Sequence, residues 1–279
     1  MALRITTLSE NAVAHGDLLG EWGLSILVEA DDATVLLDAG ASISAAFNTV
    51  NLEIDPVKID KIVLSHGHSD HTGGLRDLLK KRNKEEIEII AHPDVWAPKY
   101  SRRKDKPERF IGIPFQRLEL EYLGARFNLT SQPVHITGSI MTTGEVPAVT
   151  DFEQVESYLY VKTDSGWQPD KLLDDQALIV KTDAGLVVIL GCAHRGAVNT
   201  LYHARKLTGV EKIHMVVGGC HLMDASEERV WQTIAAFREL GVEKVSVSHC
   251  TGMSPIATMA HEFGDNFIFN NAGTVIEID

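Results

Sequence analysis

The sequence contains few cysteines and lacks any long apolar run. Three cysteines occur in 279 residues, and so small and odd a number argues against a disulfide framework, so we expect reduced thiols. No stretch approaches the roughly 20 apolar residues that span a bilayer. The first residues also lack the basic region, apolar region and cleavage site of an export signal. These absences predict a soluble, cytoplasmic protein.

Positive charge is scarce relative to negative charge. The formal net charge is −13 at pH 7, from 26 Lys and Arg against 39 Asp and Glu. Sequence-independent binding to nucleic acid or to an anionic membrane depends on summed positive charge, so this balance disfavours both partners. A small-molecule substrate is the favoured partner. The sequence does not indicate an oligomeric state.

No internal repeat, low-complexity tract or Gly-, Ser- or Pro-rich linker marks a domain boundary. We therefore predict a single domain over residues 1–279, with a lid-like elaboration at about 83–175. Near the N-terminus, strands at 23–28 and 33–38 form a hairpin around the turn 29–32. Towards the C-terminus, strands alternate with helices in α/β order. The strands are expected at 177–182, 186–190, 213–217 and 244–248, and the helices at 196–207, 226–240 and 254–263.

A dense group of potential metal ligands follows the strand expected at 62–64. The run reads His66-Gly67-His68-Ser69-Asp70-His71. In an extended segment alternate side chains share a face, so His66 and His68 can approach one ion while the following turn presents Asp70 and His71. Two adjacent metal sites result. A polar surface loop and a structural ion are the alternatives, but His and carboxylate ligands with open positions favour catalysis over a closed structural site.

Three further candidate metal ligands, His194, His221 and His249, each follow an apolar strand near the C-terminus. A single buried His is more often a satisfied core residue than a ligand. Three at equivalent strand ends favour a shared site, most strongly for His194 and His249, while His221 stays open between the two interpretations. Asp174-Asp175 precedes the strand that leads to Cys192, where a carboxylate, Asp175 in particular, either bridges the metals, orients a ligand or lies in a solvated turn.

The run His66-x-His68-x-Asp70-His71-x-Gly73-Gly74, with Asp38-Ala39-Gly40 before it, resembles the metallo-β-lactamase superfamily. The resemblance implies an αββα sandwich and two divalent metal ions, zinc before manganese, magnesium or iron. It also implies that Asp38 supports the ligands from behind. In the place of the usual bridging Asp this chain has Cys192, whose thiolate can bind zinc, although His194 can take over that coordination. The expected ligands are His66, His68, Asp70, His71, Cys192, His194 and His249.

Longer phrases at 143–147, 191–194, 218–222 and 248–252 resemble a narrower group of metal-dependent hydrolases. That group includes the archaeal 7,8-dihydropterin-6-methyl-4-(β-ribofuranosyl)aminobenzene-phosphate synthase. The predicted function is hydrolysis of a small, phosphorylated substrate by a metal-bound hydroxide, with Asp70 and His249 as catalytic residues. The alternative is the pterin condensation, in which an aryl group attacks and pyrophosphate leaves. Its candidate stacking residues are Trp22, Trp96, Tyr100 and Phe115.

A third interpretation is a metal-binding or redox module without hydrolytic turnover. Some iron-binding relatives have this role, normally joined to a flavin-binding domain that this chain is too short to contain.

A basic cluster lies between Lys99 and Arg109 in an otherwise acidic chain. We predict that this segment is part of a lid that contacts an anionic group of the substrate. Arg103 is the favoured contact, because a guanidinium binds phosphate bidentately whereas an ammonium acts as a point charge. The alternative is a solvated loop.

Overall fold

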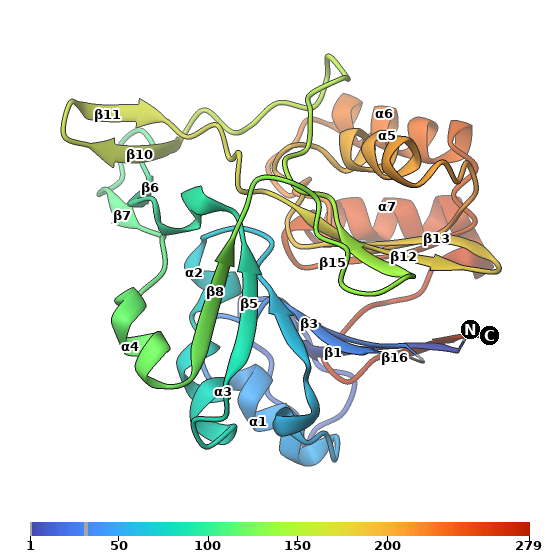
Figure 1. Ribbon diagram of the computed structural model, residues 1–279. Helices are drawn as coiled ribbons and strands as arrows, with labels where there is room; N and C mark the ends of the chain where they lie inside the picture. Colours follow the sequence, from blue (N-terminus) through green and yellow to red (C-terminus); the bar gives the residue numbers. More distant parts are fainter. Residues whose placement is uncertain (1, 31–32) are drawn as a thin grey trace.

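The computed structural model describes residues 2–30 and 33–279, which form two sheets packed face to face with helices outside each (Figure 1). The first sheet has the order β16-β1-β2-β3-β4-β5-β8 and the second the order β15-β14-β13-β12-β9. This is the αββα sandwich expected from the sequence. The first sheet comprises β1 (Leu3–Ser9), β2 (Ser25–Ala30), β3 (Ala33–Leu37), β4 (Lys61–Val63), β5 (Ile87–Ala91), β8 (Ala125–Leu129) and β16 (Val275–Ile278). The second comprises β9 (Ile140–Thr142), β12 (Ala177–Thr182), β13 (Gly185–Leu190), β14 (Ile213–Gly219) and β15 (Lys244–Ser248).

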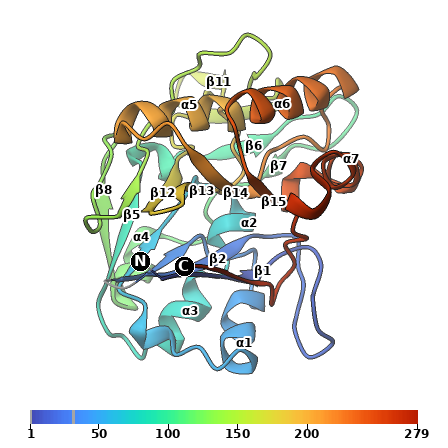
Figure 2. The same cartoon turned by 90° about the vertical axis from the view of Figure 1, so that its right-hand side faces the viewer.

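Helices cover both outer faces of the sandwich (Figure 2). The helices on the first sheet are α1 (Ser44–Asn51), α3 (Leu75–Lys81) and α4 (Arg117–Tyr122), and those on the second are α5 (Ala197–Thr208), α6 (Glu227–Glu239) and α7 (Met253–Phe263). The short helix α2 (Ser69–Thr72) lies near the junction of the layers. Capping residues agree with the bounds of α5 and α6. The Ser226 hydroxyl caps α6 by accepting from the Arg229 amide, and Gly209, with φ of 68°, ends α5.

Alternation along the strands creates three apolar layers. Ile26 of β2 faces the core between the sheets, where it joins Val187 of β13. Leu27, one residue on, faces the opposite side and packs under the helices of the first sheet. Val188 likewise packs under the helices of the second sheet. Neighbouring side chains of a strand point to opposite faces of the sheet. Because both faces of each central strand are covered, both carry apolar side chains, and the strand contributes to two layers.

The elaboration is smaller than the sequence-based range of 83–175. Strands β5, β8 and β9 fall within that range but belong to the two main sheets. Helix α4 also falls within that range and covers the first sheet, whereas a separate four-stranded sheet projects at the upper left of Figure 1. Its strands are β6 (Lys99–Ser101), β7 (Arg109–Phe110), β10 (Leu159–Thr163) and β11 (Gly166–Pro169). Of the turn predicted at 29–32, Asp31 and Asp32 lie outside the described residues.

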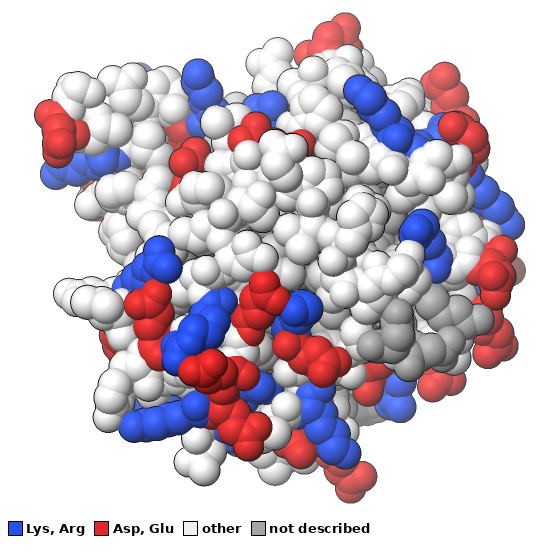
Figure 3. All heavy atoms as spheres, viewed as in Figure 1, with Lys and Arg blue, Asp and Glu red and all other residues white. Residues whose placement is uncertain are grey.

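The surface carries both signs of charge. Figure 3 shows acidic and basic side chains interspersed over the lower part of one face, around α4 and β8. Ion pairs such as Arg117 with Glu121, 2.7 Å apart, account for part of this pattern. In the described part of the chain no helix is long and apolar enough to cross a membrane.

Candidate metal centre

The histidine motif forms the loop between β4 and α2. His66 and His68 are buried there, with ring centroids 4.5 Å apart. Gly67, between them, passes so close to Val95 that a Cβ would lie 2.2 Å from the Val95 carbonyl oxygen. Only glycine fits this approach. Helix α2 then turns the chain, and the ring of His71 comes to 4.3 Å from that of His66.

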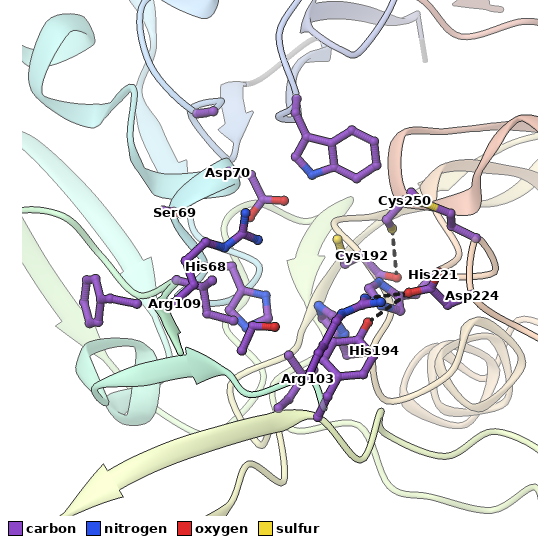
Figure 4. Close-up of a pocket in the computed structure, with 18 residues that line it drawn as sticks. His68, Ser69, Asp70, Arg103, Arg109, Cys192, His194, His221, Asp224 and Cys250 are labelled. Atoms are coloured by element: carbon purple, nitrogen blue, oxygen red, sulfur yellow. Dashed lines mark hydrogen bonds and ion pairs between the residues drawn. The ribbon is translucent and has the colours of Figure 1, made fainter. Parts of the chain in front are cut away.

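Three parallel strand ends meet this loop. Strands β13, β14 and β15 pair in parallel, so their carboxyl ends lie at one edge of the sheet. The residues that follow these strands are Cys192 and His194, then His221, then His249. Figure 4 shows Cys192, His194 and His221 facing His68 and Asp70 across a shared space. The second sheet therefore delivers its candidate ligands to the loop of the first.

Three groups of potential ligand atoms include the Cys192 thiol. Two of them contain a pair of histidines: one joins Cys192 to His66 and His194, and the other joins it to His71 and His249. The third joins Cys192 to His221 and Cys250. Within each group the atoms lie within 4.8 Å of one another, and His71 Nε2 is 3.0 Å from Cys192 Sγ. A thiol between two sets of imidazoles has the placement that a bridging ligand needs.

Several potential donor atoms of the cluster lack hydrogen-bond partners, which metal ions would replace. The Nε2 atoms of His68, His194 and His249 are buried and have no hydrogen-bond partner among the described residues. Leaving such an atom unpaired costs about 1–3 kcal/mol, and a coordinated ion removes that cost. Imidazole, thiolate and carboxylate donors in one cluster are also the set that zinc and related transition metals prefer.

Burial keeps several of these imidazoles neutral. It is the main cause that lowers the pKa of His66 and of His68 well below the ordinary value. Burial, with the nearby charge of His71, lowers the pKa of His194 to about 3. A neutral imidazole keeps the lone pair that coordination requires. Asp70 stays ionised, because although burial raises its pKa, His71 and the nearby His249, whose Nε2 lies 3.5 Å from Asp70 Oδ2, hold it far below its usual range.

Asp38 supports the loop from behind. Its Oδ2 lies 2.6 Å from His71 Nδ1, and its two oxygens accept hydrogen bonds from the Ser65 hydroxyl and amide at 2.6 and 2.7 Å. Burial alone would lower the pKa of His71, but Asp38 and Asp70 outweigh burial and raise it. A carboxylate on one ring nitrogen directs the other nitrogen towards a metal. The contact of Asp38 with His71 Nδ1 is the one that a carboxylate supporting a metal ligand would make.

A pocket of about 340 Å³ opens onto the cluster. Its volume suits a small molecule. Residues from both sheets and from the four-stranded sheet line it (Figure 4), among them Trp22, His68, Asp70, Arg103, Arg109, Tyr158, Cys192, His194, His221 and Asp224.

The family model of the metallo-beta-lactamase superfamily matches residues 23–249. The chain belongs to this superfamily. It is 33% identical to the 7,8-dihydropterin-6-methyl-4-(beta-D-ribofuranosyl)-aminobenzene-5'-phosphate synthase of Methanocaldococcus jannaschii, over 99% of this chain and 96% of that protein.

Two solved structures resemble the fold over nearly its whole length. Tm1679, a metal-dependent hydrolase of the beta-lactamase superfamily, superposes with a TM-score of 0.85 at 29% identity, over 99% of both chains. Zn²⁺-bound PqqB from Methylobacterium extorquens superposes with a TM-score of 0.58 at 10% identity, over 100% of both chains. The second likeness concerns the fold alone.

In this metallo-beta-lactamase superfamily chain, His249 is held by residues that the sequence did not reveal. Its amide donates to Glu10 Oε1 at 2.7 Å, and its Nδ1 lies 3.0 Å from Asn11 Oδ1. Both partners lie just after β1, more than 200 residues away in the chain. No local motif marks them.

Glu156 is a second residue that the sequence did not reveal. Its Oε2 lies 3.2 Å from His194 Nδ1 and 3.6 Å from His221 Nε2. His221 therefore shares one carboxylate with His194, and it also lies in a potential ligand group with Cys192 and Cys250. Asp175 lies outside these ligand groups: one oxygen accepts from the Arg195 amide at 2.8 Å, and burial raises its pKa to about 7.

Lys99 is not one of the exposed cations of the basic cluster. Its side chain is 1% exposed, with Nζ 2.8 Å from Asp170 Oδ2 and 2.9 Å from Asp174 Oδ1. Asp174 in turn accepts a hydrogen bond from the Gly67 amide at 2.8 Å. Lys99 therefore supports the metal loop through Asp174, and we call it the buried brace. The two carboxylates compensate the cost of burying its charge.

Arg103 lines the pocket as expected but already has a partner. Its guanidinium lies 2.6 Å from Asp224 Oδ2 and 3.9 Å from the centre of the Tyr158 ring. Its contact with substrate stays a prediction.

Of the four candidate stacking residues, Trp22 alone is among the residues that line the pocket at the cluster. Trp96 packs against Phe127, Tyr100 packs against Phe110 and Trp167, and Phe115 packs on the core under the first sheet's helices.

Proposed function

We propose that this protein is a metal-dependent hydrolase that acts on a small, phosphorylated substrate. The observation that carries the proposal is that two ligand groups meet at Cys192, beside a pocket of about 340 Å³. One ion would be held by His66, His68 and His194, the other by Asp70, His71 and His249, with Cys192 shared between them.

Two divalent ions, when bound, supply an activated water near neutral pH and neutralise charge on a phosphoryl group. In the hydrolysis a water oxygen bonds to phosphorus, the ester P–O bond breaks, and the leaving alcohol takes up a proton. The chain positions the participants. Asp38 holds His71 in one tautomer, and Asp70, 3.5 Å from His249 Nε2, keeps a negative charge at the reacting centre. We assign Asp70 and His249 as the catalytic residues on this basis.

The second candidate is the pterin-phosphate condensation at the same site. It is supported by the 33% identity to the Methanocaldococcus jannaschii synthase over nearly the full length of both chains. In that reaction an aryl group would replace water as the nucleophile and pyrophosphate would leave. Trp22 is 51% exposed at the pocket, with its ring centroid 5.3 Å from that of His249, so its exposed part would be the surface on which a flat substrate stacks.

The experiment compares the two reactions in one metal-loaded preparation. Protein loaded with zinc or manganese is assayed with 4-nitrophenyl phosphodiesters, and separately with the dihydropterin pyrophosphate and aminobenzene ribofuranoside phosphate pair. We expect phosphodiester turnover that His68→Ala and Asp70→Ala lower by at least about a thousandfold, as loss of a metal-ion contribution implies.

His214→Gln is the matched control, because His214 lies on β14 but pairs with Glu243 at the surface, 2.7 Å away. It should keep wild-type turnover. Condensation without phosphodiester turnover would replace the first candidate by the second, and turnover that persists in both site variants would reject the site.

A further inference from the structure

The two arginines that line the pocket have different surroundings. Arg103 is neutralised by Asp224, 2.6 Å away, and stacks on Tyr158. Arg109 lines the same pocket, but across residues 2–30 and 33–279 its guanidinium has no ion-pair or hydrogen-bond partner. Figure 4 shows Arg109 on the side of His68, Ser69 and Asp70, and Arg103 on the side of His194. A chain with net charge −13 thus leaves one pocket arginine without a carboxylate.

The backbone ties Arg109 to the metal loop. Arg109 is on β7, paired with Ser101 of β6. Two residues later the Ile111 carbonyl accepts a hydrogen bond from the Ser69 amide at 2.7 Å, and the Ile111 amide donates to the Lys99 carbonyl at 2.9 Å. Ser69 lies between two of the proposed ligands, and Lys99 is the buried brace. Arg109 is therefore presented from a backbone that is bonded directly to the metal loop, which limits the ordering cost of binding a ligand there.

We propose that Arg109 binds a second acidic group of the substrate, a phosphate or a carboxylate, separate from the group that reacts at the metal centre. This inference rests on the proposed function and narrows its substrate class to small molecules with two acidic groups. A guanidinium offers paired donors that match either acid bidentately. A substrate whose only charge lies at the reacting phosphoryl group would leave Arg109 unused.

Binding of inert ligands tests the inference without turnover. Alkane-α,ω-diphosphonates with chains of two to five carbons are compared with alkylphosphonates of the same length, by calorimetry on the manganese-loaded protein. At the best length we expect the diphosphonate to bind about tenfold to a hundredfold more tightly, the range of a charged hydrogen-bonded contact. Arg109→Gln should abolish this difference, and Arg109→Lys should retain part of it.

Arg102→Gln is the matched control, because Arg102 pairs with Glu108, 2.8 Å away, on the same segment and does not line the pocket at the metal centre. It should keep the full difference. Equal affinities at every length, or a difference that survives Arg109→Gln, would overturn the inference, as would a difference that only Arg103→Gln removes. Because phosphodiester turnover is measured separately, an Arg109-dependent difference without turnover would reject the proposed function and support the inference.

Discussion

At the scale of single residues, Cys192 is the position that departs from the usual bridging aspartate. Without metal, burial and the neighbouring Cys250 raise the pKa of its thiol well above the ordinary value. A coordinating thiol is deprotonated outright, so an ion at Cys192 must displace a proton. Sulfur is also a softer ligand than carboxylate and favours zinc over magnesium. We therefore expect a cysteine here to shift metal preference towards zinc while keeping a negative charge between the two ligand groups.

The buried imidazoles predict how the stability of the metal-free protein depends on pH. The pKa of His194 is lowered from 6.5 to about 3, chiefly by burial. Between these values the unfolded chain binds a proton that the folded chain does not, so the free energy of unfolding falls as the pH falls, by up to about 1.4 kcal/mol per pH unit. Urea unfolding of chelated protein from pH 7 to pH 4.5 measures this slope. We expect His194→Gln to have a shallower slope, and an unchanged slope would contradict the role of burial.

At the scale of elements, the site lies where strands end and the backbone is strained. Asp38, Ala193, His221 and His249 all have positive φ, at 60°, 51°, 47° and 54°. For residues with a Cβ this conformation costs of order 1–3 kcal/mol and persists only where surrounding structure enforces it. The contacts of Asp38 with Ser65 and of His249 with Glu10 provide that enforcement. The strained backbone thus lowers the stability of the fold locally, and it orients the side chains of Asp38, His221 and His249 towards the site.

The brace beneath the metal loop gives a prediction at this scale. Burial lowers the pKa of Lys99, but Asp174 and Asp170 outweigh burial and raise it, so the pair of carboxylates depends on this cation. We expect Lys99→Met to lower the free energy of unfolding by about 3–5 kcal/mol, because it leaves buried charge uncompensated. Metal affinity should fall with it, since Asp174 also holds the Gly67 amide.

Urea unfolding and zinc titration measure both effects. Lys106→Met, an exposed position on the same segment, is the control and should resemble wild type. A loss below about 1 kcal/mol for Lys99→Met would show that the brace is not needed, because that is the range of an exposed ion pair.

At the scale of the whole molecule, the apolar layers and the metal centre are separate. The three core clusters lie between the sheets and under the helices, whereas the ligands gather at one edge of the sandwich. The fold should therefore survive removal of the ions. We expect chelated protein to keep its circular dichroism spectrum and to melt cooperatively.

Metal should then raise the melting temperature by mass action, with about 2.7 kcal/mol of stabilisation at a hundredfold excess over Kd. Inductively coupled plasma analysis should find about two ions per chain in replete protein. His68→Ala should remove most of the metal-dependent rise. A protein that unfolds on chelation would contradict the separation of core and site.

Much of the fold could be predicted from the chain itself. Period-two and helical apolar patterns predicted β2, β3 and β4 of the first sheet, β12 to β15 of the second, and helices α5 to α7, because those patterns reflect which face each element buries. Strands β1, β5, β8, β9 and β16 were not predicted. The spacing of His66, His68, Asp70 and His71 is local and needs no knowledge of the fold. The single domain and the assigned ligand roles stay predictions.

Only the tertiary structure decided which distant residues complete the site. Lys99, Glu10 and Glu156 meet their partners across 71, 239 and 38 positions of chain, and no periodicity encodes such contacts. The basic cluster illustrates the limit: its composition predicted an anion contact but could not separate the buried Lys99 and the paired Arg103 from the unpaired Arg109. Charge is a property of a residue, whereas availability for a ligand depends on which carboxylates the fold places beside it.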